Sequence, residues 1–323
     1  MISRRAFLIS VAVLVTPLEA VAQQRRAVPH VGVLAQDIQP GLLETLRDEL
    51  QRLGYVEGKS IITDVRNAEG RGDRLQLLVA DLLRFKVDVL VAGNTPAAKA
   101  ARNATTTVPI VIMRVADPVK AGLVRSLAHP GANVTGLSFM PDVLGAKAIE
   151  ALAQTIPSLS RVAAFYKADN PGALLVVTET ERRSAELGVR FQRLPIRDPS
   201  GLPDAFTAAV RAGAQAVFVM DDGAMTNMRG PFVKYASQRS LPIVSIYKDF
   251  AEAGGLFAYG PDLDHVYRRA AHYVADILRG TKPSELPVEQ ADTFHFVINL
   301  KTAKALGLTI SPSLLLRANQ VIE

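Results

Sequence analysis

Short apolar runs alternate with longer amphipathic stretches along the chain. The first run, HVGVLA at 30–35, is followed by leucines at helical spacing from Leu42 to Leu53, and this pattern stops at Gly54. The same order of strand and helix repeats until a fifth strand-like run, and the small residues after 93 predict a further helix. The predicted strands of this first series are 30–35, 61–66, 87–93, 109–113 and 133–138.

A second series of the same kind begins after residue 160. Its predicted strands are 161–166, 190–196, 216–222 and 242–247. Regular alternation predicts parallel sheets covered by helices on both faces, because each parallel connection needs a crossover. We expect an α/β fold of two doubly wound, Rossmann-like lobes, and a single (β/α)8 barrel is the alternative.

The order becomes less regular after Tyr247. A strand at 256–260, a long amphipathic helix at 262–279 that ends at Gly280, and a strand at 294–299 follow one another. This order is typical of a chain that returns to its first domain after completing a second one.

The first residues have the features of an export signal. Arg4 and Arg5 precede an apolar stretch at 6–18, and small residues at 20–22 supply a cleavage pattern. We expect residues 1–22 to be a signal peptide, of either the Sec or the twin-arginine type. The apolar stretch is shorter than the roughly 20 residues that span a bilayer. The mature protein is therefore expected to be soluble and periplasmic, without stable membrane insertion.

The composition narrows the possible chemistry. The 323 residues are 49% hydrophobic and 21% charged, which is typical of a well-packed globular protein. The net charge of +6 comes from Lys and Arg scattered among Asp and Glu, so we expect no nucleic-acid partner. Because the chain contains no cysteine, disulfides, thiolate metal sites and a lipid-modified N-terminal cysteine are excluded.

Signatures of catalysis are missing from the sequence. There is no G-x-S-x-G, H-E-x-x-H or G-x-G-x-x-G motif, and the five histidines lack metal-ligand spacing. Asp221 and Asp222 are adjacent on a predicted strand, so they point to opposite faces and do not form an acid/base pair. We expect no enzyme activity, no metal and no cofactor.

Polar and aromatic residues recur where the predicted strands end. In open α/β sheets ligands bind at these carboxyl ends, next to helix N-termini. Two lobes facing each other would bring these residues together in one cleft. The candidate ligand-binding residues are Gln36, Asp37, Asn94, Thr95, Ala97, Ala98, Arg114, Asp117, Ser138, Phe139, Tyr166, Asn170, Asp221, Asp222 and Tyr247.

Several longer motifs resemble those of a known family. They are RDELQRLGYVEG (47–58), GNTPAA (93–98), VADPVKAGLV (115–124), PGANVTGLS (130–138), YGPD (259–262) and INLKTAKALGLTI (298–310). Together they are similar to the ABC transporter substrate-binding proteins that include tryptophan- and tyrosine-binding relatives.

The resemblance implies a type I periplasmic-binding-protein fold with three crossovers between the lobes. The expected N-terminal lobe is 28–141 plus 251–281, and the expected C-terminal lobe is 142–250 plus 282–323. The implied partners are a small-molecule solute, a membrane permease and a cytoplasmic ATPase, and we expect the protein itself to be a monomer.

The resemblance also implies individual ligand contacts. Thr95 and the backbone N–H groups of Ala97 and Ala98 would bind a carboxylate. The residue types themselves predict Thr95 as the helix N-cap and Pro96 at the first helical position, which needs no N–H. Asp117 and Asn170 would face the ligand, and Asp221 or Asp222 would receive an amino group.

Two differences from the family pattern argue against an amino acid as the ligand. Ala224 and its neighbour Gly223 follow Asp222 where relatives often have an Asn-Thr type pair, and Arg114 is a large cation. Arg114 either points into the cleft and favours an acidic ligand, or pairs with Asp117 or Asp37.

The predicted function is capture of a carboxylate-bearing solute, an amino acid or an aromatic or other organic acid, by hinge closure, followed by delivery to an ABC importer. Two alternatives remain: a ligand-sensing subunit that docks on a receptor, and an exported enzyme that uses Asp221 or Asp222.

Overall fold

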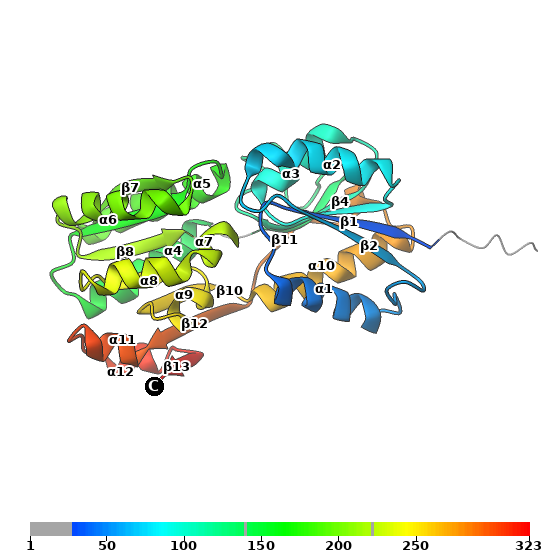
Figure 1. The fold of residues 1–323 in the computed structure, drawn as a ribbon. Helices are drawn as coiled ribbons and strands as arrows, with labels where there is room; N and C mark the ends of the chain where they lie inside the picture. The colour runs from blue at the N-terminus through cyan, green and yellow to red at the C-terminus, as the bar shows by residue number, and fades with distance from the viewer. Residues whose placement is uncertain (1–27, 139–140, 221–222) are drawn as a thin grey trace, which may run out of the picture.

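The structure is a computed structural model that describes residues 28–138, 141–220 and 223–323. Two separate open sheets lie in two lobes, each sheet being covered by helices on both faces (Figure 1). This arrangement confirms the predicted α/β fold with two doubly wound lobes. A single closed barrel was the alternative, and the two open sheets contradict it.

The first lobe contains a six-stranded sheet in the order β11-β5-β4-β3-β1-β2. Every neighbouring pair in it is parallel, and β2 lies at one edge. The elements of this lobe are β1 His30–Ala35, α1 Pro40–Arg52, β2 Ile62–Asn67, the short 3-10 helix Gly72–Arg74, α2 Leu75–Arg84, β3 Val89–Ala92, α3 Thr95–Ala104, β4 Ile110–Val115, β5 Val134–Ser138, α10 Leu263–Leu278, the 3-10 helix Pro283–Glu285 and β11 Glu289–Gln290.

The second lobe contains a seven-stranded sheet in the order β13-β12-β10-β9-β8-β6-β7. Its strands are parallel except for the antiparallel pair β10–β12. The elements are α4 Pro141–Thr155, β6 Arg161–Lys167, α5 Pro171–Ser184, β7 Arg190–Ile196, α6 Leu202–Arg211, β8 Ala216–Met220, α7 Gly223–Asn227, α8 Arg229–Ser237, β9 Ile243–Ser245, α9 Lys248–Glu252, β10 Phe257–Pro261, β12 Phe294–Asn299, α11 Leu300–Ala305, α12 Pro312–Leu315 and β13 Gln320–Ile322, with 3-10 helices at Ala185–Leu187 and Pro199–Gly201.

The chain passes between the lobes after β5, between β10 and α10, and between β11 and β12. These passages correct two parts of the expected division. Strand β10, expected in the first lobe with 251–281, pairs with β9 and β12 in the second sheet. Strand β11, expected in the second lobe with 282–323, pairs with β5 in the first sheet. The physical reason is that an apolar pattern specifies a strand but not the sheet that accepts it.

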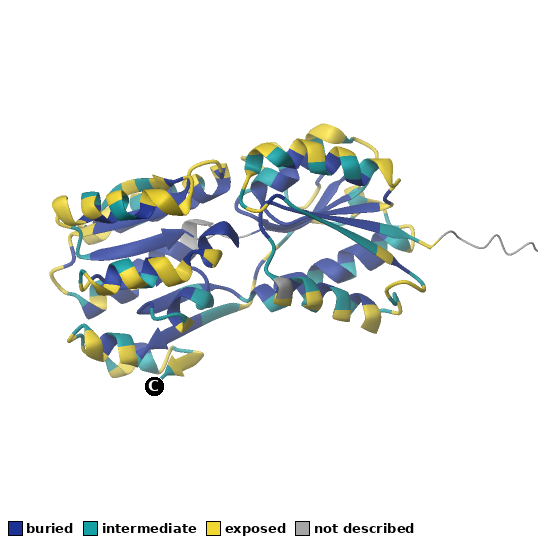
Figure 2. Ribbon diagram, viewed as in Figure 1, coloured by how far each residue is buried: buried dark blue, intermediate teal, exposed yellow. Residues whose placement is uncertain are grey.

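Alternation along the central strands divides the core of the first lobe into two layers. Val89 and Val91 of β3 belong to the apolar cluster that contains residues of α1 and α10. Leu90 and Ala92 belong to the cluster formed with α2 and α3. Because neighbouring strand residues point to opposite faces, one strand fills both layers. Figure 2 shows these buried strands between helices whose outer faces are exposed.

A salt bridge holds the last strand of the first sheet against α10. Arg269 on α10 donates from Nε and Nη2 to the two carboxylate oxygens of Glu289 on β11, at 2.8 and 2.6 Å. Tyr273, one turn further along α10, donates its hydroxyl to the carbonyl of Pro287 at 2.6 Å. Burial raises the pKa of Tyr273 above its ordinary value, so this hydroxyl stays protonated. These contacts hold the segment that precedes the last crossover against the first lobe.

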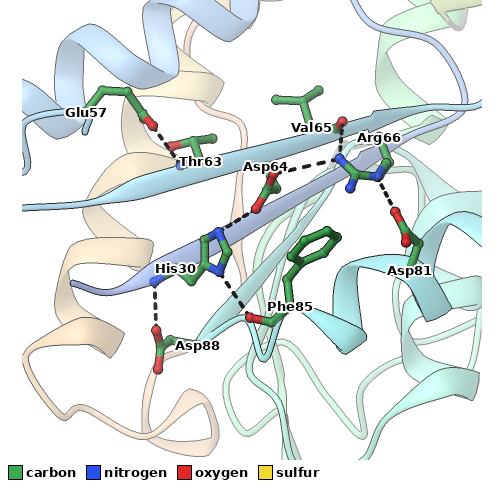
Figure 3. A network of polar contacts seen from close by, with 9 residues as sticks. All are labelled: His30, Glu57, Thr63, Asp64, Val65, Arg66, Asp81, Phe85 and Asp88. Carbon is green, nitrogen blue, oxygen red and sulfur yellow. Dashed lines mark hydrogen bonds and ion pairs between the residues drawn. The ribbon is translucent and has the colours of Figure 1, made fainter. Parts of the chain in front are cut away.

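A polar network runs along one edge of the first sheet, from the amino-terminal end of β1 to Arg66 near the carboxyl end of β2 (Figure 3). His30, the first residue of β1, contacts the Asp64 carboxylate on β2 and places Nδ1 3.1 Å from the carbonyl of Phe85. Arg66 lies 3.8 Å from Asp64 and donates from Nε to Asp81 on α2 at 2.7 Å. These contacts join β1, β2 and α2 within the first lobe.

Candidate ligand-binding site

The carboxyl ends of the strands in the two sheets meet at the junction between the lobes. Gln36, directly after β1, donates from Nε2 to Asp169 Oδ2 at 3.0 Å. Its neighbour Asp37 accepts a hydrogen bond from Asn227 Nδ2 at 2.8 Å. Each bond joins a residue of the first lobe to one of the second. The structure therefore describes the lobes in contact at the edge where the sequence placed the ligand.

Helix α3 begins at this junction with a different cap from the one predicted. Asn94 is the N-cap residue: its Oδ1 accepts from Ala97 N at 3.1 Å, and its carbonyl accepts from Ala98 N at 2.9 Å. Thr95 and Pro96 are the first two helical residues. Thr95 as cap was wrong, because the asparagine side chain one residue earlier reaches the third helical N–H. The two N–H groups assigned to a carboxylate thus already have partners.

Helix α5 begins opposite α3 with the same chemistry. Asn170 is its N-cap and accepts from Gly172 N at 2.9 Å and from Ala173 N at 3.3 Å. Pro171 occupies the first helical position, which needs no N–H donor. A β-carbon on Gly172 would lie 2.4 Å from Thr95 Oγ1, so the two helix N-termini approach closely. Two positive dipole ends therefore converge at one point between the lobes.

Gln36 connects the residues that precede these two helices. Its Oε1 lies 3.4 Å from Asn94 Nδ2, while its Nε2 donates to Asp169, the residue before Asn170. Asp169 also lies 3.5 Å from the buried ammonium of Lys167. Gln36 and Lys167 are themselves buried, whereas the Asp169 side chain is 43% exposed, so the contacts run from the interior to the surface. They link the cap of α3 to the chain that leads into α5.

Arg114, at the end of β4, extends toward the second lobe. Its Nε donates to the carbonyl of Gly93 at 3.1 Å, and its guanidinium carbon lies 6.0 Å from the ring centre of Tyr247. The Asp117 carboxylate accepts hydrogen bonds from backbone N–H groups of its own loop, and Asp37 accepts from the second lobe as described. Arg114 is buried, so its charge contributes to the potential at the junction.

One pocket of the junction lies beside Tyr247. It has a volume of about 390 Å³ and is lined by residues of both lobes, among them Leu42, Tyr247, Lys248 and Asp264. Lys248 Nζ lies 3.7 Å from Asp264 Oδ2, which adds a further polar contact between the lobes. Of the candidate residues, Tyr247 lines this pocket.

Two other pockets lie beside the loop that contains Asp117. One, of about 540 Å³, is lined by Asp117 and Ser138 among others, and the other, of about 180 Å³, by Thr95, Asp117 and Gly172 among others. The Ser138 hydroxyl is buried and has no hydrogen-bond partner among the residues that the structure describes. Lys120 lines both pockets.

The remaining candidates have different positions. Tyr166, at the end of β6, is buried in the apolar cluster that extends through both lobes. Phe139, Asp221 and Asp222 lie outside the described residues. Ala97 and Ala98, in the first turn of α3, are fully buried, so they contribute to packing as well as to the helix end.

Sequence reasoning missed several residues that hold the junction. Asp169 directly precedes the candidate Asn170 after the end of β6 but was not itself among the candidate residues. Asn227 and Glu179 lie on helices and belong to no motif, and Lys120 lies within the family motif 115–124 but was not among the candidate residues. Only their placement across two lobes makes them partners, and no local pattern encodes that placement.

The histidines on α10 contact carboxylates rather than one another. His272 Nε2 lies 3.1 Å from Glu49 Oε1, and His265 Nε2 lies 3.5 Å from Asp292 Oδ1. Within 28–138, 141–220 and 223–323, no group of three or more His, Cys, Asp or Glu side chains could hold a metal ion. Over the same described ranges, no helix is both long enough and apolar enough to cross a membrane.

Two doubly wound lobes joined by repeated crossovers, with polar strand ends meeting between them, define a two-lobed solute-binding protein of the type I periplasmic class. Within that class, the chain belongs to the ABC transporter substrate binding protein family, whose model matches residues 31–322. The family resemblance drawn from the sequence motifs is thereby confirmed.

Known relatives extend the similarity over most of the chain. A tyrosine-binding protein of Clostridioides difficile (strain R20291) is 27% identical over 269 residues, which is 83% of this chain and 76% of the relative. The crystal structure of a conserved domain protein from Vibrio cholerae is 28% identical, with a TM-score of 0.85 over 91% of this chain and 100% of that one. A Streptococcus pneumonia ABC domain in complex with L-Trp is 26% identical, with a TM-score of 0.84 over 92% and 100%.

Proposed function

We propose that this protein captures a small carboxylate-bearing solute between its lobes. The supporting observation is the convergence of the α3 and α5 N-termini at Thr95 and Gly172. Helix N-termini attract anions through their dipoles and N–H groups, and the buried Arg114 adds positive charge nearby. Because the N–H groups of Ala97 and Ala98 bond to Asn94, the Thr95 hydroxyl is the side-chain donor that we assign to the carboxylate.

The solute that we propose is an aromatic amino acid or a related aromatic acid. Relatives are named for tyrosine binding or were solved with L-Trp. Tyr247 lines a pocket of about 390 Å³ and offers a ring against which an aromatic group can pack. Asp117, Ser138 and Gln36 lie at the same junction and would complete the polar contacts. An acidic ligand without an amino group is favoured by Arg114.

The cellular role that we propose is that of the solute-binding component of an ABC importer. Closure of the lobes would present the solute to a membrane permease driven by a cytoplasmic ATPase. We infer export to the periplasm as a soluble monomer after removal of residues 1–22, with no enzyme activity and no cofactor.

Three matched compounds test the ligand chemistry: L-tryptophan, indole-3-propionate, which lacks the ammonium group, and tryptophanamide, which lacks the carboxylate. The tyrosine series provides the same comparison. At about 100 times its Kd, a ligand raises the unfolding free energy by about 2.7 kcal/mol, which thermal unfolding detects. We expect stabilisation by the two carboxylates and not by the amide. Stabilisation by the amide alone, or by no carboxylate of a broad panel, would overturn the proposal.

A further inference from the structure

One face of α5 approaches the loop after β4, which belongs to the other lobe. Lys120 in that loop places Nζ 3.1 Å from Glu179 Oε1 on α5. The Lys120 backbone N–H donates to Asp117 Oδ1 at 2.9 Å, and the Lys120 ammonium lies 3.9 Å from Asp117 Oδ2. The pair therefore connects the second lobe to the loop that carries a candidate ligand contact.

Glu179 is held in its charged form at this position. Arg182 donates from Nε to Glu179 Oε2 at 3.0 Å, while Lys120 binds the other carboxylate oxygen. Hydrogen bonds from Arg182 and Lys120 keep the pKa of Glu179 below its ordinary value. The Glu179 side chain is 17% exposed, whereas the side chains of Lys120 and Arg182 are 60% and 61% exposed. The acid thus lies inside the junction and the cations cover it.

Lys120 also lies between two pockets. Lys120 lines both the pocket of about 180 Å³ next to Thr95 and the pocket of about 540 Å³ that contains Glu179 and Arg182. The smaller pocket adjoins the converging helix N-termini, where we place the solute carboxylate.

We propose that Lys120 and Glu179 form a latch across the lobes that sets the rate at which bound solute is released. The two residues act through closure and are positioning residues, not ligand contacts. The inference rests on the proposed function, since it assigns the latch to the same site. The latch forms when the lobes close, because its halves belong to different lobes, and salt weakens it because Lys120 is largely exposed.

Release of solute provides the first test. Lys120→Met keeps the length of the side chain and removes its charge, and Glu179→Gln removes the opposite charge. We expect each variant to speed dissociation about two- to fivefold at low salt in stopped-flow measurements, as an exposed ion pair permits. The double variant should be no faster than the faster single variant, because both remove the same contact.

Glu181→Gln is the matched control. Glu181 lies two residues from Glu179 on α5 but pairs with Arg193 at 2.6 Å, within the second lobe. Its variant should release solute at the wild-type rate. At high salt the release rates of all five proteins, the wild type, the two single variants, the double variant and the control, should converge. Equal rates at low salt, or additive effects of the two latch substitutions, would overturn the latch.

A second measurement does not depend on any solute. Leu77 and Val210 are exposed positions in the first and second lobe. Because the chain has no cysteine, Leu77→Cys and Val210→Cys in one protein place a donor and an acceptor fluorophore at these two positions alone. We expect lower inter-lobe energy transfer in Lys120→Met than in wild type and Glu181→Gln, without added ligand. Equal energy transfer in Lys120→Met and wild type would overturn the latch, whether or not any panel compound binds. If transfer is lowered but no panel compound stabilises the protein, only the proposed solute class is overturned.

Discussion

A β-carbon at residue 172 would lie 2.4 Å from the hydroxyl oxygen of Thr95. Gly172 belongs to α5 in the second lobe and Thr95 to α3 in the first, so this contact exists when the lobes are closed. The backbone of Gly172 is outside the left-handed region, so glycine is not needed there for its conformation. It is needed for the close approach of the two helix N-termini.

Gly172→Ala should therefore impair binding without impairing folding. The added methyl group prevents full closure, and we expect the affinity for solute to fall by at least about tenfold, which corresponds to roughly 1.4 kcal/mol. The unfolding free energy should stay constant or rise by about 0.5–1 kcal/mol, since alanine favours a helix more than glycine does. Calorimetric titration and urea denaturation of the same samples measure both quantities.

Gly230→Ala is the control for this prediction. Gly230 is the second residue of α8, as Gly172 is of α5, and a β-carbon there would meet no atom within 4 Å. Its variant should bind solute with wild-type affinity. An affinity of Gly172→Ala equal to that of Gly230→Ala would show that solute binds without full closure.

Thr95→Val tests the assigned hydroxyl donor. The substitution keeps the volume of the side chain but removes one donor, and a hydrogen bond to a charged group contributes roughly 1.5–3 kcal/mol. We expect the affinity for a carboxylate to fall about tenfold or more, measured by calorimetry. Thr178→Val, which removes an exposed hydroxyl bonded to the Leu174 carbonyl on α5, is the control. Unchanged affinity in Thr95→Val would place the carboxylate elsewhere.

The secondary structure could be predicted closely where burial imposed a clear pattern. The predicted strands 30–35, 190–196 and 294–299 coincide with β1, β7 and β12. The prediction at 242–247 was too long, since β9 covers Ile243–Ser245. Apolar residues continue past its end because Ile246 and Tyr247 are buried at the junction, and burial alone does not distinguish strand from loop.

The assignment of strands to lobes could not be predicted in the same way. Residues 257–261 are almost entirely buried, and a buried strand can belong to either sheet. Only the pairing of this strand with β9 and β12 assigns it to the second lobe. Residues 289–290 form a strand too short to carry any pattern. Its place follows from the bond between Arg269 and Glu289, which connects residues that are distant from any motif.

The candidate site could be predicted at the level of strand ends but not of individual bonds. Asn94 and Thr95 are both good capping residues, and the choice between them depends on a backbone geometry that composition does not specify. The pair Lys120–Glu179 joins residues 59 positions apart in different lobes. Such a contact depends on how the lobes close, and both residues would otherwise be ordinary solvated charges.

Glu289→Gln should weaken the first lobe slightly. The substitution removes the charge that binds Arg269, and both side chains are about a third exposed, at 37% and 36%. Solvent screens such a pair, so we expect a loss of about 1 kcal/mol or less in unfolding free energy, measured by urea denaturation. Asp73→Asn in the more exposed pair with Arg71 is the control and should change nothing. A loss as large in the control would show that any surface charge, and not this bond, is responsible.

The contribution of Glu289 should also depend on pH in a defined direction. Hydrogen bonds from Arg269 hold the pKa of Glu289 below its ordinary value in the folded protein, against the opposing effect of burial. A lowered folded-state pKa stabilises the protein above the unfolded-state pKa of about 4.3, and this stabilisation is lost as the pH falls through the folded value. The difference in unfolding free energy between wild type and Glu289→Gln should therefore stay constant from about pH 8 to 5 and shrink below about pH 4. Urea denaturation across this range measures the difference. A difference that grew on acidification would mean that folding raises the pKa of Glu289 instead of lowering it.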